Sequence, residues 1–320
     1  MNSLFRNKFV LLFNCIFLFI LCSICVVAND EKLLENVKIS MSTDSKYVYP
    51  TIVSITSIME NSKKDIDYEF YILLSGNVNK NLKGKIMSLS KKYNNCHINT
   101  INMKNDFKSA FTSRHITSAA YYRLSLPSIL NNIDKVLYMD VDTITEGDVS
   151  KLYHLNIDDY YLAGVKNPKF VSYYGKGYAN MLKIKSMSEY INSGVMLLNL
   201  KKMREDNLEK KFRALSKHRF PYHDQDVINS VCYKKIYHLP FKYNMLMSYD
   251  IYNNNAYKTS LISKCFSKKD WDEGRKHPVI IHYHVGNKPW FSRRTRLADR
   301  WWKYANKSGF IKEIRARYHA

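Results

Sequence analysis

The sequence predicts an α/β protein in which helices flank one mainly parallel, Rossmann-like sheet. Its first half alternates short apolar runs with amphipathic helical stretches, which is the pattern of repeated βαβ units. The apolar run Val136–Met139 contains no polar alternation, as expected of a strand that is buried on both faces. The 320 residues, 46% of them hydrophobic, show no internal repeat, low-complexity linker or clear domain break, so we expect one large α/β domain.

The first half is expected to contain four strands with helices between them. The expected strands are Val37–Ser42, Tyr68–Leu74, His97–Met103 and Val136–Met139. The expected helices are Pro50–Met59, Asn81–Tyr93 and Ser118–Asn131. Pro50 suits a first helical turn, because the N–H that proline lacks would have no partner there.

The second half is less regular. Its expected strands are Tyr161–Val165, the later part of Tyr190–Leu200, which opens as a turn, and Pro278–Tyr283. Its expected helices are the basic amphipathic Lys201–Ser216 and the stretch His223–Cys232, which opens with acids. Tyr173–Ile184 is expected to be an irregular connection.

The N-terminal segment, residues 1–30, is expected to be a signal anchor or a signal peptide. Arg6 and Lys8 precede an apolar run from Phe9 to Ala28, which is about the length of a membrane-spanning helix. The sequence Val26–Ala28 also resembles a signal-peptidase site. The positive-inside rule would place the remainder outside the cytoplasm, in a Golgi-type secretory lumen or a bacterial cell envelope, unless the segment inserts in the opposite sense.

The composition adds a strongly basic charge and a distinct C-terminal segment. The net charge of +22 favours phosphates, acidic glycans or an anionic membrane, while no motif for nucleic acid is present. Residues 291–320 interleave basic and aromatic side chains, which either lie on a membrane or pack on the main domain. We therefore expect three parts: a leader at 1–30, a main domain at 31–290 and a helical tail at 291–320.

A pair of acids marks the expected chemistry. Asp140 and Asp142 directly follow the apolar strand Val136–Met139, and in an extended chain their carboxylates point the same way. Ligands of open α/β sheets bind beyond the carboxyl ends of the strands. Four Asp-X-Asp sequences occur, but only this one follows a strand-like run. Two hard oxygen ligands there suit a divalent cation that also binds phosphate oxygens.

Two further residues fit the same site. His282 ends a second apolar strand, and Lys288 follows it across a glycine-containing loop. Two carboxylates and one imidazole suit Mn²⁺ better than Ca²⁺, with Mg²⁺ as a second choice. The cation and the Lys288 ammonium would together stabilise a leaving diphosphate without a proton donor. Each residue alone also has a structural explanation, as a strand-end histidine or a surface lysine.

Six motifs in a fixed order carry a resemblance to a known family. They are Ile39–Tyr47, Arg114–Thr117 with Tyr122–Leu124, Tyr138–Asp142, Asn192–Val195, His223–Asn229 and His282–Trp290. From about Val37 to Trp302 the chain resembles glycosyltransferase family 8, which includes glycogenin and bacterial lipopolysaccharide galactosyl- and glucosyltransferases. One spacing departs from the family pattern, because Gly286 stands four residues after His282 instead of three.

The resemblance implies a GT-A fold and site residues by position. The implied metal ligands are Asp140, Asp142 and His282. The implied nucleotide-binding residues are Ser42, Asp44, Tyr47, Ile116, Asp140, Val141, Gly286 and Lys288. The implied donor-sugar residues are Arg123, Asn192, Asp224 and Gln225, of which Gln225 and Asp224 are the catalytic candidates. Asp224 also has a structural explanation as a helix N-cap.

The implied function is a retaining, Mn²⁺-dependent transfer of a hexose from a UDP-sugar to a glycan or glycolipid. Galactose and glucose are the favoured hexoses. A neutral Gln225 amide is a poor nucleophile, so we expect a front-face reaction in which the departing UDP oxygen helps to deprotonate the acceptor. Tyr173–Ile184 and Ser248–Asp270 are expected to shape the acceptor site. The alternative is a non-catalytic nucleotide- or glycan-binding relative at a membrane surface.

Overall fold

The computed structural model describes residues 36–103, 106–107, 110, 118–173, 176–247, 257, 261–284 and 286–319. The predicted leader, Ile116 with its motif at 114–117, and much of the loop 248–270 lie outside these residues. Within the described ranges, none of the helices has the length and apolar character needed to cross a bilayer.

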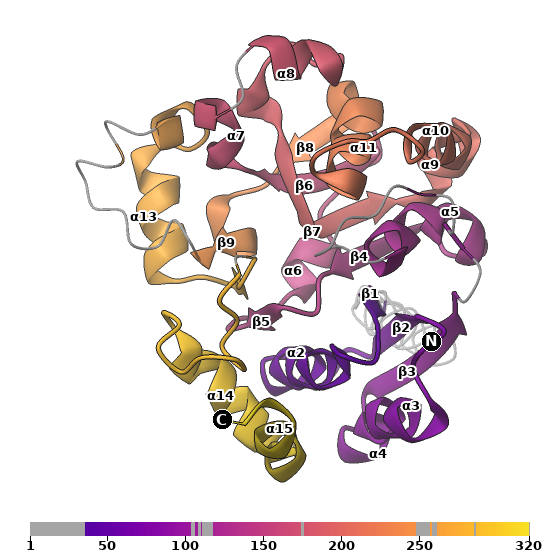
Figure 1. Cartoon of the computed structure of the whole chain (residues 1–320), viewed down its shortest axis with the longest axis vertical. Coiled ribbons are helices and arrows are strands. Elements are labelled where there is room, and N and C mark those ends of the chain that lie inside the picture. The colour runs from indigo at the N-terminus through magenta and orange to yellow at the C-terminus, as the bar shows by residue number, and fades with distance from the viewer. Residues whose placement is uncertain are drawn as a thin grey trace, which may run out of the picture. The chain divides into compact units, whose positions relative to one another are not determined.

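A seven-stranded sheet forms the centre of the described chain, with the strand order β3-β2-β1-β4-β7-β6-β8 (Figure 1). The strands are β1 Val37–Thr43, β2 Tyr68–Leu74, β3 Cys96–Asn102, β4 Lys135–Met139, β6 Leu162–Lys166, β7 Ile191–Asn199 and β8 Ile236–His238. Four neighbouring pairs are parallel, and β7 runs antiparallel to both β4 and β6. The prediction of an α/β fold with a mainly parallel sheet is confirmed.

The antiparallel strand β7 decides which residues meet at the end of β4. Met139 pairs with Val195, and the Asp140 N–H donates to the Gly194 carbonyl at 2.7 Å. The beginning of β7, not its end, therefore lies beside the acids that follow β4. A second sheet of three strands, in the order β5-β10-β9, completes this edge; its strands are β5 Thr143–Thr145, β9 Met245–Leu246 and β10 Ile280–His282.

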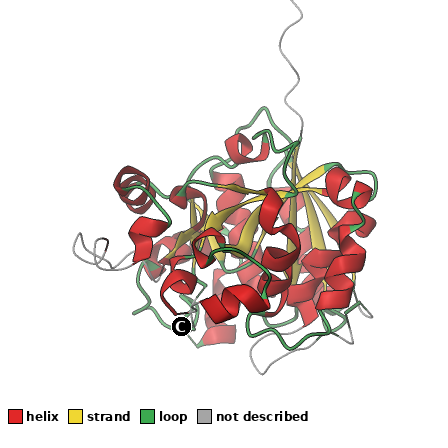
Figure 2. Cartoon of the chain, turned by 90° about the horizontal axis from the view of Figure 1, so that it is seen from above, coloured by secondary structure: helices red, strands yellow, loops and turns green. Residues whose placement is uncertain are grey.

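Helices lie on both sides of the main sheet (Figure 2). The α-helices are α2 Val48–Glu60, α3 Lys80–Met87, α4 Leu89–Lys92, α5 Leu126–Ile129, α6 Ser150–Tyr153, α7 Pro168–Tyr173, α8 Lys176–Met181, α9 Leu200–Glu205, α10 Leu208–Leu215, α11 His223–Cys232, α13 Lys268–Lys276, α14 Ala298–Lys307 and α15 Ile311–Tyr318. The 3₁₀ helices are η1 Ser118–Ser125, η2 Met187–Glu189, η3 Tyr233–Lys235, η4 Phe241–Asn244 and η6 Leu261–Lys264.

Three predicted long helices are interrupted. The predicted helix Asn81–Tyr93 divides at Ser88. The predicted helix Ser118–Asn131 is instead a 3₁₀ helix followed by α5, where Pro127 cannot donate a helical hydrogen bond. The predicted helix Lys201–Ser216 divides at Asn207, which has the left-handed φ of 53° that asparagine tolerates better than most residues. Hydrophobic periodicity continues through such breaks, which is why the sequence predicted single helices.

Two helices form where none was expected. The stretch Tyr173–Ile184, expected to be irregular, contains α8. The polar stretch Lys268–Lys276 forms α13, whose N-terminus is capped by the Ser267 hydroxyl, which accepts the Asp270 N–H. Only Trp271 and Gly274 of α13 are buried, so its sequence carries little hydrophobic periodicity to reveal it.

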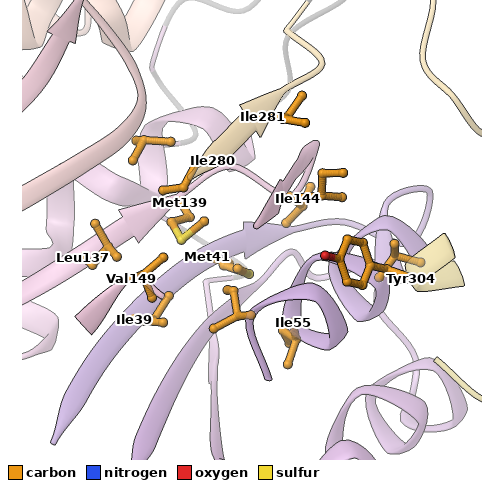
Figure 3. Close-up of a cluster of buried hydrophobic side chains, with 14 of the residues drawn as sticks. Ile39, Met41, Ile55, Leu137, Met139, Ile144, Val149, Ile280, Ile281 and Tyr304 are labelled. Atoms are coloured by element: carbon orange, nitrogen blue, oxygen red, sulfur yellow. The ribbon is translucent and has the colours of Figure 1, made fainter. Parts of the chain in front are cut away.

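Successive residues of β4 supply the cores on opposite faces of the sheet. Leu137 and Met139 belong to one buried cluster, with β1, α2, β5 and β10, part of which is drawn in Figure 3. Val136 and Tyr138 belong to a second cluster, which includes residues of α11. Such alternation is expected of an extended chain. The prediction that Val136–Met139 is a strand buried on both faces is confirmed.

The C-terminal helices contribute to the first of these clusters. Trp301, Tyr304 and Ile314 are fully buried in it, and the Asn61 side chain at the end of α2 donates to the Tyr304 hydroxyl at 2.9 Å. Phe291, just before these helices, is instead 63% exposed. The aromatic side chains of α14 are therefore packed inside the protein. The proposed boundary at residue 290 stays a prediction.

Trp301→Ala should lower the free energy of unfolding by about 3–5 kcal/mol, because it removes a large side chain from a closed core. Phe291→Ala, an aromatic deletion ten residues earlier at an exposed position, should change it by less than about 0.5 kcal/mol. Urea unfolding of both variants provides the comparison. A loss below about 1 kcal/mol for Trp301→Ala would mean that the tail does not unfold with the main domain.

Candidate active site

Asp140, Asp142 and His282 form the centre of the site. Each offers one ligand atom, and the three atoms lie within 4.8 Å of one another. His282 Nε2 is 3.1 Å from Asp142 Oδ1 and 3.9 Å from Asp140 Oδ2. Two carboxylate oxygens and one imidazole nitrogen at this spacing fit a divalent transition-metal ion. The three residues expected to be metal ligands are therefore brought together.

The two sheets place these ligands. Asp140 follows β4, Asp142 precedes β5, and His282 ends β10 opposite Thr143 of β5. The Tyr283 N–H donates to the Asp142 carbonyl at 2.9 Å, and the Thr143 hydroxyl donates to the Asp140 carbonyl at 2.7 Å. The short β5–β10 pairing thus brings together residues that are 140 positions apart in the chain.

Gly194 leaves the space that this cluster occupies. A Cβ atom at position 194 would lie 2.2 Å from His282 Cε1 and 2.8 Å from Asp140 Oδ2, both far inside contact distance. The close approach arises because β7 pairs antiparallel with β4, which puts Gly194 beside Asp140. A glycine is required here by this close approach and not by an unusual backbone angle.

Arg123 joins the metal cluster to α11. Its guanidinium is buried, donates to Asp140 Oδ1 at 2.7 Å and lies 3.2 Å from Asp224 Oδ2. It also donates to the Ser193 carbonyl at 2.7 Å and lies over the Tyr138 ring. Arginine suits this position because its planar group can bind several acceptors at once.

Lys288 compensates the negative charge of Asp142. Its ammonium lies 2.6 Å from Asp142 Oδ2 and also donates to the Tyr283 carbonyl at 2.5 Å. Burial by itself would raise the pKa of Asp142, but Lys288 and then His282 outweigh it and hold that pKa well below its ordinary value. Asp142 therefore remains ionised, as a metal ligand must be.

Asp224 differs from Asp142 in its surroundings. Burial raises the pKa of Asp224 to about 6; the Arg123 guanidinium opposes this rise, and the Asp140 carboxylate adds to it. The suggestion that Asp224 is a helix N-cap is wrong. Tyr222 occupies the N-cap position of α11, and the Asp224 carboxylate contacts Arg123 and the Ser193 hydroxyl instead.

Gln225 and Asn192 contact each other deep in the site. The Asn192 side-chain amide donates to Gln225 Oε1 at 3.0 Å, and the Ser193 N–H donates to the same oxygen at 3.1 Å. The other end of the Gln225 amide donates to the Tyr190 hydroxyl at 3.1 Å. Burial raises the pKa of Tyr190 well above its ordinary value, so that hydroxyl stays protonated. Gln225 is thus held at both ends.

The expected nucleotide turn adjoins the metal cluster. Asp44 Oδ1 accepts the N–H groups of Lys46 and Tyr47, at 2.8 and 3.2 Å, so this carboxylate holds the turn after β1. Burial, and then the charges of Asp142 and Asp44, raise the pKa of the Tyr47 phenol. Tyr318 and Arg317 of α15 donate to the Lys46 and Ser45 carbonyls from outside the turn.

The remaining residues expected to bind the nucleotide are Ser42, Val141, Gly286 and Ile116. Ser42 lies in β1 beside Tyr138, and Val141 is buried between the two acids. A Cβ atom at Gly286 would meet nothing within 4 Å, so sterics do not require a glycine there. Ile116 lies outside the described residues.

Several residues of the site were not foreseen from the sequence. The Asn244 side-chain oxygen lies 3.0 Å from His282 Nδ1, and its amide nitrogen donates to Asn192 Oδ1 at 2.8 Å. Asp226 accepts hydrogen bonds from Tyr178 and Tyr190. Asp226 sits in the motif at 223–229, so its presence was visible but its role was not. Asn244 precedes a two-residue strand in an irregular stretch, where no periodicity or motif draws attention to it.

Comparison with known proteins identifies the family of this chain. The family model described as Glycosyl transferase family 8 matches residues 38–294. A putative glycosyltransferase of Haemophilus influenzae is 29% identical over 269 residues, 82% of this chain and 76% of the relative. The lipopolysaccharide 1,2-glucosyltransferase of Escherichia coli K12 is 28% identical over 273 residues, 80% of this chain and 79% of the relative.

A solved structure shares the fold. The chain matches a crystal structure of the galactosyltransferase LgtC, in complex with donor and acceptor sugar analogues, with a TM-score of 0.70 and 22% identity. The match covers 85% of this chain and 96% of that chain. At this identity the likeness establishes the architecture, and it agrees with the expected GT-A fold.

Gly194→Ala should weaken Mn²⁺ binding by about 10-fold or more, because the added methyl group displaces His282 or Asp140 from the ligand cluster. The concentration of free Mn²⁺, measured by electron paramagnetic resonance in a titration, reports the dissociation constant.

Gly84→Ala is the matched control, since a Cβ atom in that helix position meets nothing within 4 Å. It should leave the Mn²⁺ affinity unchanged and stabilise α3 by up to about 1 kcal/mol. Equal Mn²⁺ affinity in the two alanine variants would contradict the account of Gly194.

Proposed function

Since the chain belongs to glycosyltransferase family 8, we propose that it moves a hexose from a UDP-sugar to a glycan or glycolipid acceptor and retains the anomeric configuration. The observation that carries this proposal is the cluster of Asp140, Asp142 and His282 with Lys288 against it. Those residues provide a candidate cation site and an ammonium beside it, which are two groups that can stabilise a leaving diphosphate.

Mn²⁺ is the ion that we propose for the three ligands, with Mg²⁺ as a weaker substitute. A mixed oxygen and nitrogen ligand set favours Mn²⁺ over Ca²⁺. When bound, the ion would supply positive charge to the diphosphate of the donor. Lys288 would add a second positive charge at the same place, and Tyr47 with the turn at Asp44 would border the nucleotide.

The surroundings of Gln225 favour a front-face reaction. Its amide oxygen already accepts two hydrogen bonds, and its amide nitrogen donates one, so it is held as an oriented dipole. Asp226, which like Asp224 is a carboxylate of α11, is fully buried and accepts three hydrogen bonds, which leaves it no approach to a sugar. Neither side chain is placed as a nucleophile, and Gln225 would instead stabilise positive charge on the sugar.

The hexose and the acceptor are proposed from chemistry and likeness together. The E. coli relative is a glucosyltransferase by name, and the LgtC structure is that of a galactosyltransferase, so glucose and galactose are the first donors to test. The basic surface suits an acceptor or membrane that carries negative charge. Membrane association through residues 1–30 remains part of the proposal.

The proposal predicts slow UDP release by the full-length protein from one member of a UDP-sugar panel with Mn²⁺. EDTA should abolish the release, and Asp142→Asn should lower it at least about 100-fold, since a metal ligand is lost. Asp65→Asn, which alters an exposed Asp-X-Asp sequence away from the site, should leave it unchanged.

The outcomes distinguish the alternatives. Mn²⁺-dependent binding of UDP without release from any donor, even with acceptors added, would favour the non-catalytic nucleotide-binding alternative. Release that persists in EDTA and in Asp142→Asn would contradict the assignment of the metal site.

The contact of α15 with the nucleotide turn generates a second prediction. Tyr318→Phe removes the 2.7 Å hydrogen bond to the Lys46 carbonyl and should cost about 1 kcal/mol of UDP binding, about fivefold in Kd. Tyr161→Phe, which removes a hydrogen bond to Asp206 elsewhere, is the control. Isothermal titration with UDP and Mn²⁺ measures both, and unchanged affinity in Tyr318→Phe would show that the turn keeps its shape without α15.

A further inference from the structure

A continuous chain of side-chain hydrogen bonds runs from the metal ligand His282 to the buried carboxylate of Asp226. Its links, in order, are His282 Nδ1 to Asn244 Oδ1 at 3.0 Å, Asn244 Nδ2 to Asn192 Oδ1 at 2.8 Å, Asn192 Nδ2 to Gln225 Oε1 at 3.0 Å, Gln225 Nε2 to Tyr190 Oη at 3.1 Å, and Tyr190 Oη to Asp226 Oδ1 at 2.6 Å. All six side chains are buried.

The Asp226 end sets the direction of the links through Tyr190 to Gln225. An ionised carboxylate can only accept, and Asp226 Oδ2 already accepts from the Tyr178 hydroxyl at 2.6 Å and the Tyr222 N–H at 2.8 Å. Tyr190 has a single hydroxyl hydrogen, which goes to Asp226. Its oxygen can then only accept from Gln225, so the Gln225 amide must turn its NH₂ group toward Tyr190.

Two backbone groups fix the direction in the middle of the chain. The Ser193 N–H donates to Gln225 Oε1 at 3.1 Å, and the Gly194 N–H donates to Asn192 Oδ1 at 3.0 Å. A backbone N–H cannot become an acceptor, so both amides have their oxygen atoms where these bonds require them. Asn192 must then receive an N–H from Asn244, which leaves the Asn244 oxygen facing His282.

We propose that Asn244 is a positioning residue that selects the tautomer of His282, with the hydrogen on Nδ1 and a lone pair on Nε2. The Asn244 oxygen can only accept, so Nδ1 of His282 must carry the hydrogen that it receives. Nε2 then faces Asp140 and Asp142 without a hydrogen, which is the form that binds a metal ion.

The selection is needed because the surroundings of Nε2 favour the opposite tautomer in the metal-free protein. Asp142 Oδ1 lies 3.1 Å from Nε2 and would accept a hydrogen from it. A neutral imidazole that kept its hydrogen on Nε2 would have no lone pair for the ion. The same chain also orients Gln225, so one network prepares the metal ligand and the proposed catalytic amide. The proposed function supplies only the choice of Mn²⁺ as the ion.

The test reads the tautomer directly on the full-length, metal-free protein. Long-range ¹H–¹⁵N correlation spectra at pH 9 distinguish the protonated from the unprotonated ring nitrogen of neutral His282, whose signals are assigned by their loss in His282→Gln. The wild type should show the hydrogen on Nδ1. A hydrogen on Nε2 in the wild type would overturn the proposal.

Asn244→Leu removes the acceptor with little change in volume. It should move the hydrogen to Nε2 and weaken Mn²⁺ binding by about 10–100-fold. Asn244→Asp restores an acceptor and should return the hydrogen to Nδ1, even if Asn192 loses its partner. A hydrogen that stays on Nδ1 in a folded Asn244→Leu protein would overturn the role of Asn244.

Asp226→Asn tests the far end of the chain. The Ser193 and Gly194 N–H groups still fix the Gln225 and Asn192 amides in this variant, so His282 should keep its hydrogen on Nδ1. Asp206→Asn is the matched control, because Asp206 accepts from Tyr161 at 2.6 Å outside this chain, and it should leave the His282 spectrum unchanged. Both tautomers of His282 in a folded Asp226→Asn protein would overturn the inference that these two backbone groups set the direction of the chain.

Neither readout needs a sugar donor. A hydrogen on Nδ1 together with no UDP release from any donor would support this inference and argue against the proposed transfer. UDP release together with a hydrogen on Nε2 would do the reverse.

Discussion

The antiparallel pairing of β7 with β4 is the constraint on which the rest of the site depends. It places the beginning of β7 beside the acids that follow β4, with the Asp140 N–H bonded to the Gly194 carbonyl. From that position Gly194 leaves room for His282, and Asn192 reaches Gln225. A parallel β7 would present its other end to Asp140, and none of these contacts could form. The strand direction therefore matters more to function here than the sheet's mainly parallel character.

Charge compensation is the second condition for this site. Asp140, Asp142 and Asp224 lie close together, and the cations that balance them approach from different parts of the chain: Arg123 from η1 and Lys288 from the loop after β10. Burying one of these acids without its cation would cost several kcal/mol. Arg123 has almost no exposed surface and several partners, so it acts as a structural support, whereas Lys288 pairs chiefly with one carboxylate and one carbonyl.

Sequence reasoning succeeded where local residues alone decide the outcome. β2 and α11 have the predicted bounds, since a closed apolar run and an acid-rich helix start carry their own signals. The three residues that could hold a metal ion were also identified from local context and family likeness. Prediction failed at Asn207, where one left-handed residue divides a periodic helix, and at α13, where a polar helix is held by a serine cap and one buried Trp271. These features depend on a few atoms and leave the hydrophobic pattern unchanged.

By itself, the sequence determined the α/β class, most strands, the family and the three candidate metal ligands, because each follows from short-range pattern or motif. Only the tertiary structure decided that β7 is antiparallel, that β5, β9 and β10 form a separate small sheet, and that Asn244 contacts His282. Strand direction and side-chain partners depend on contacts between residues far apart in the chain. Asn244 and His282 are 38 positions apart, and Lys288 and Asp142 are 146 positions apart, so no local pattern could relate them.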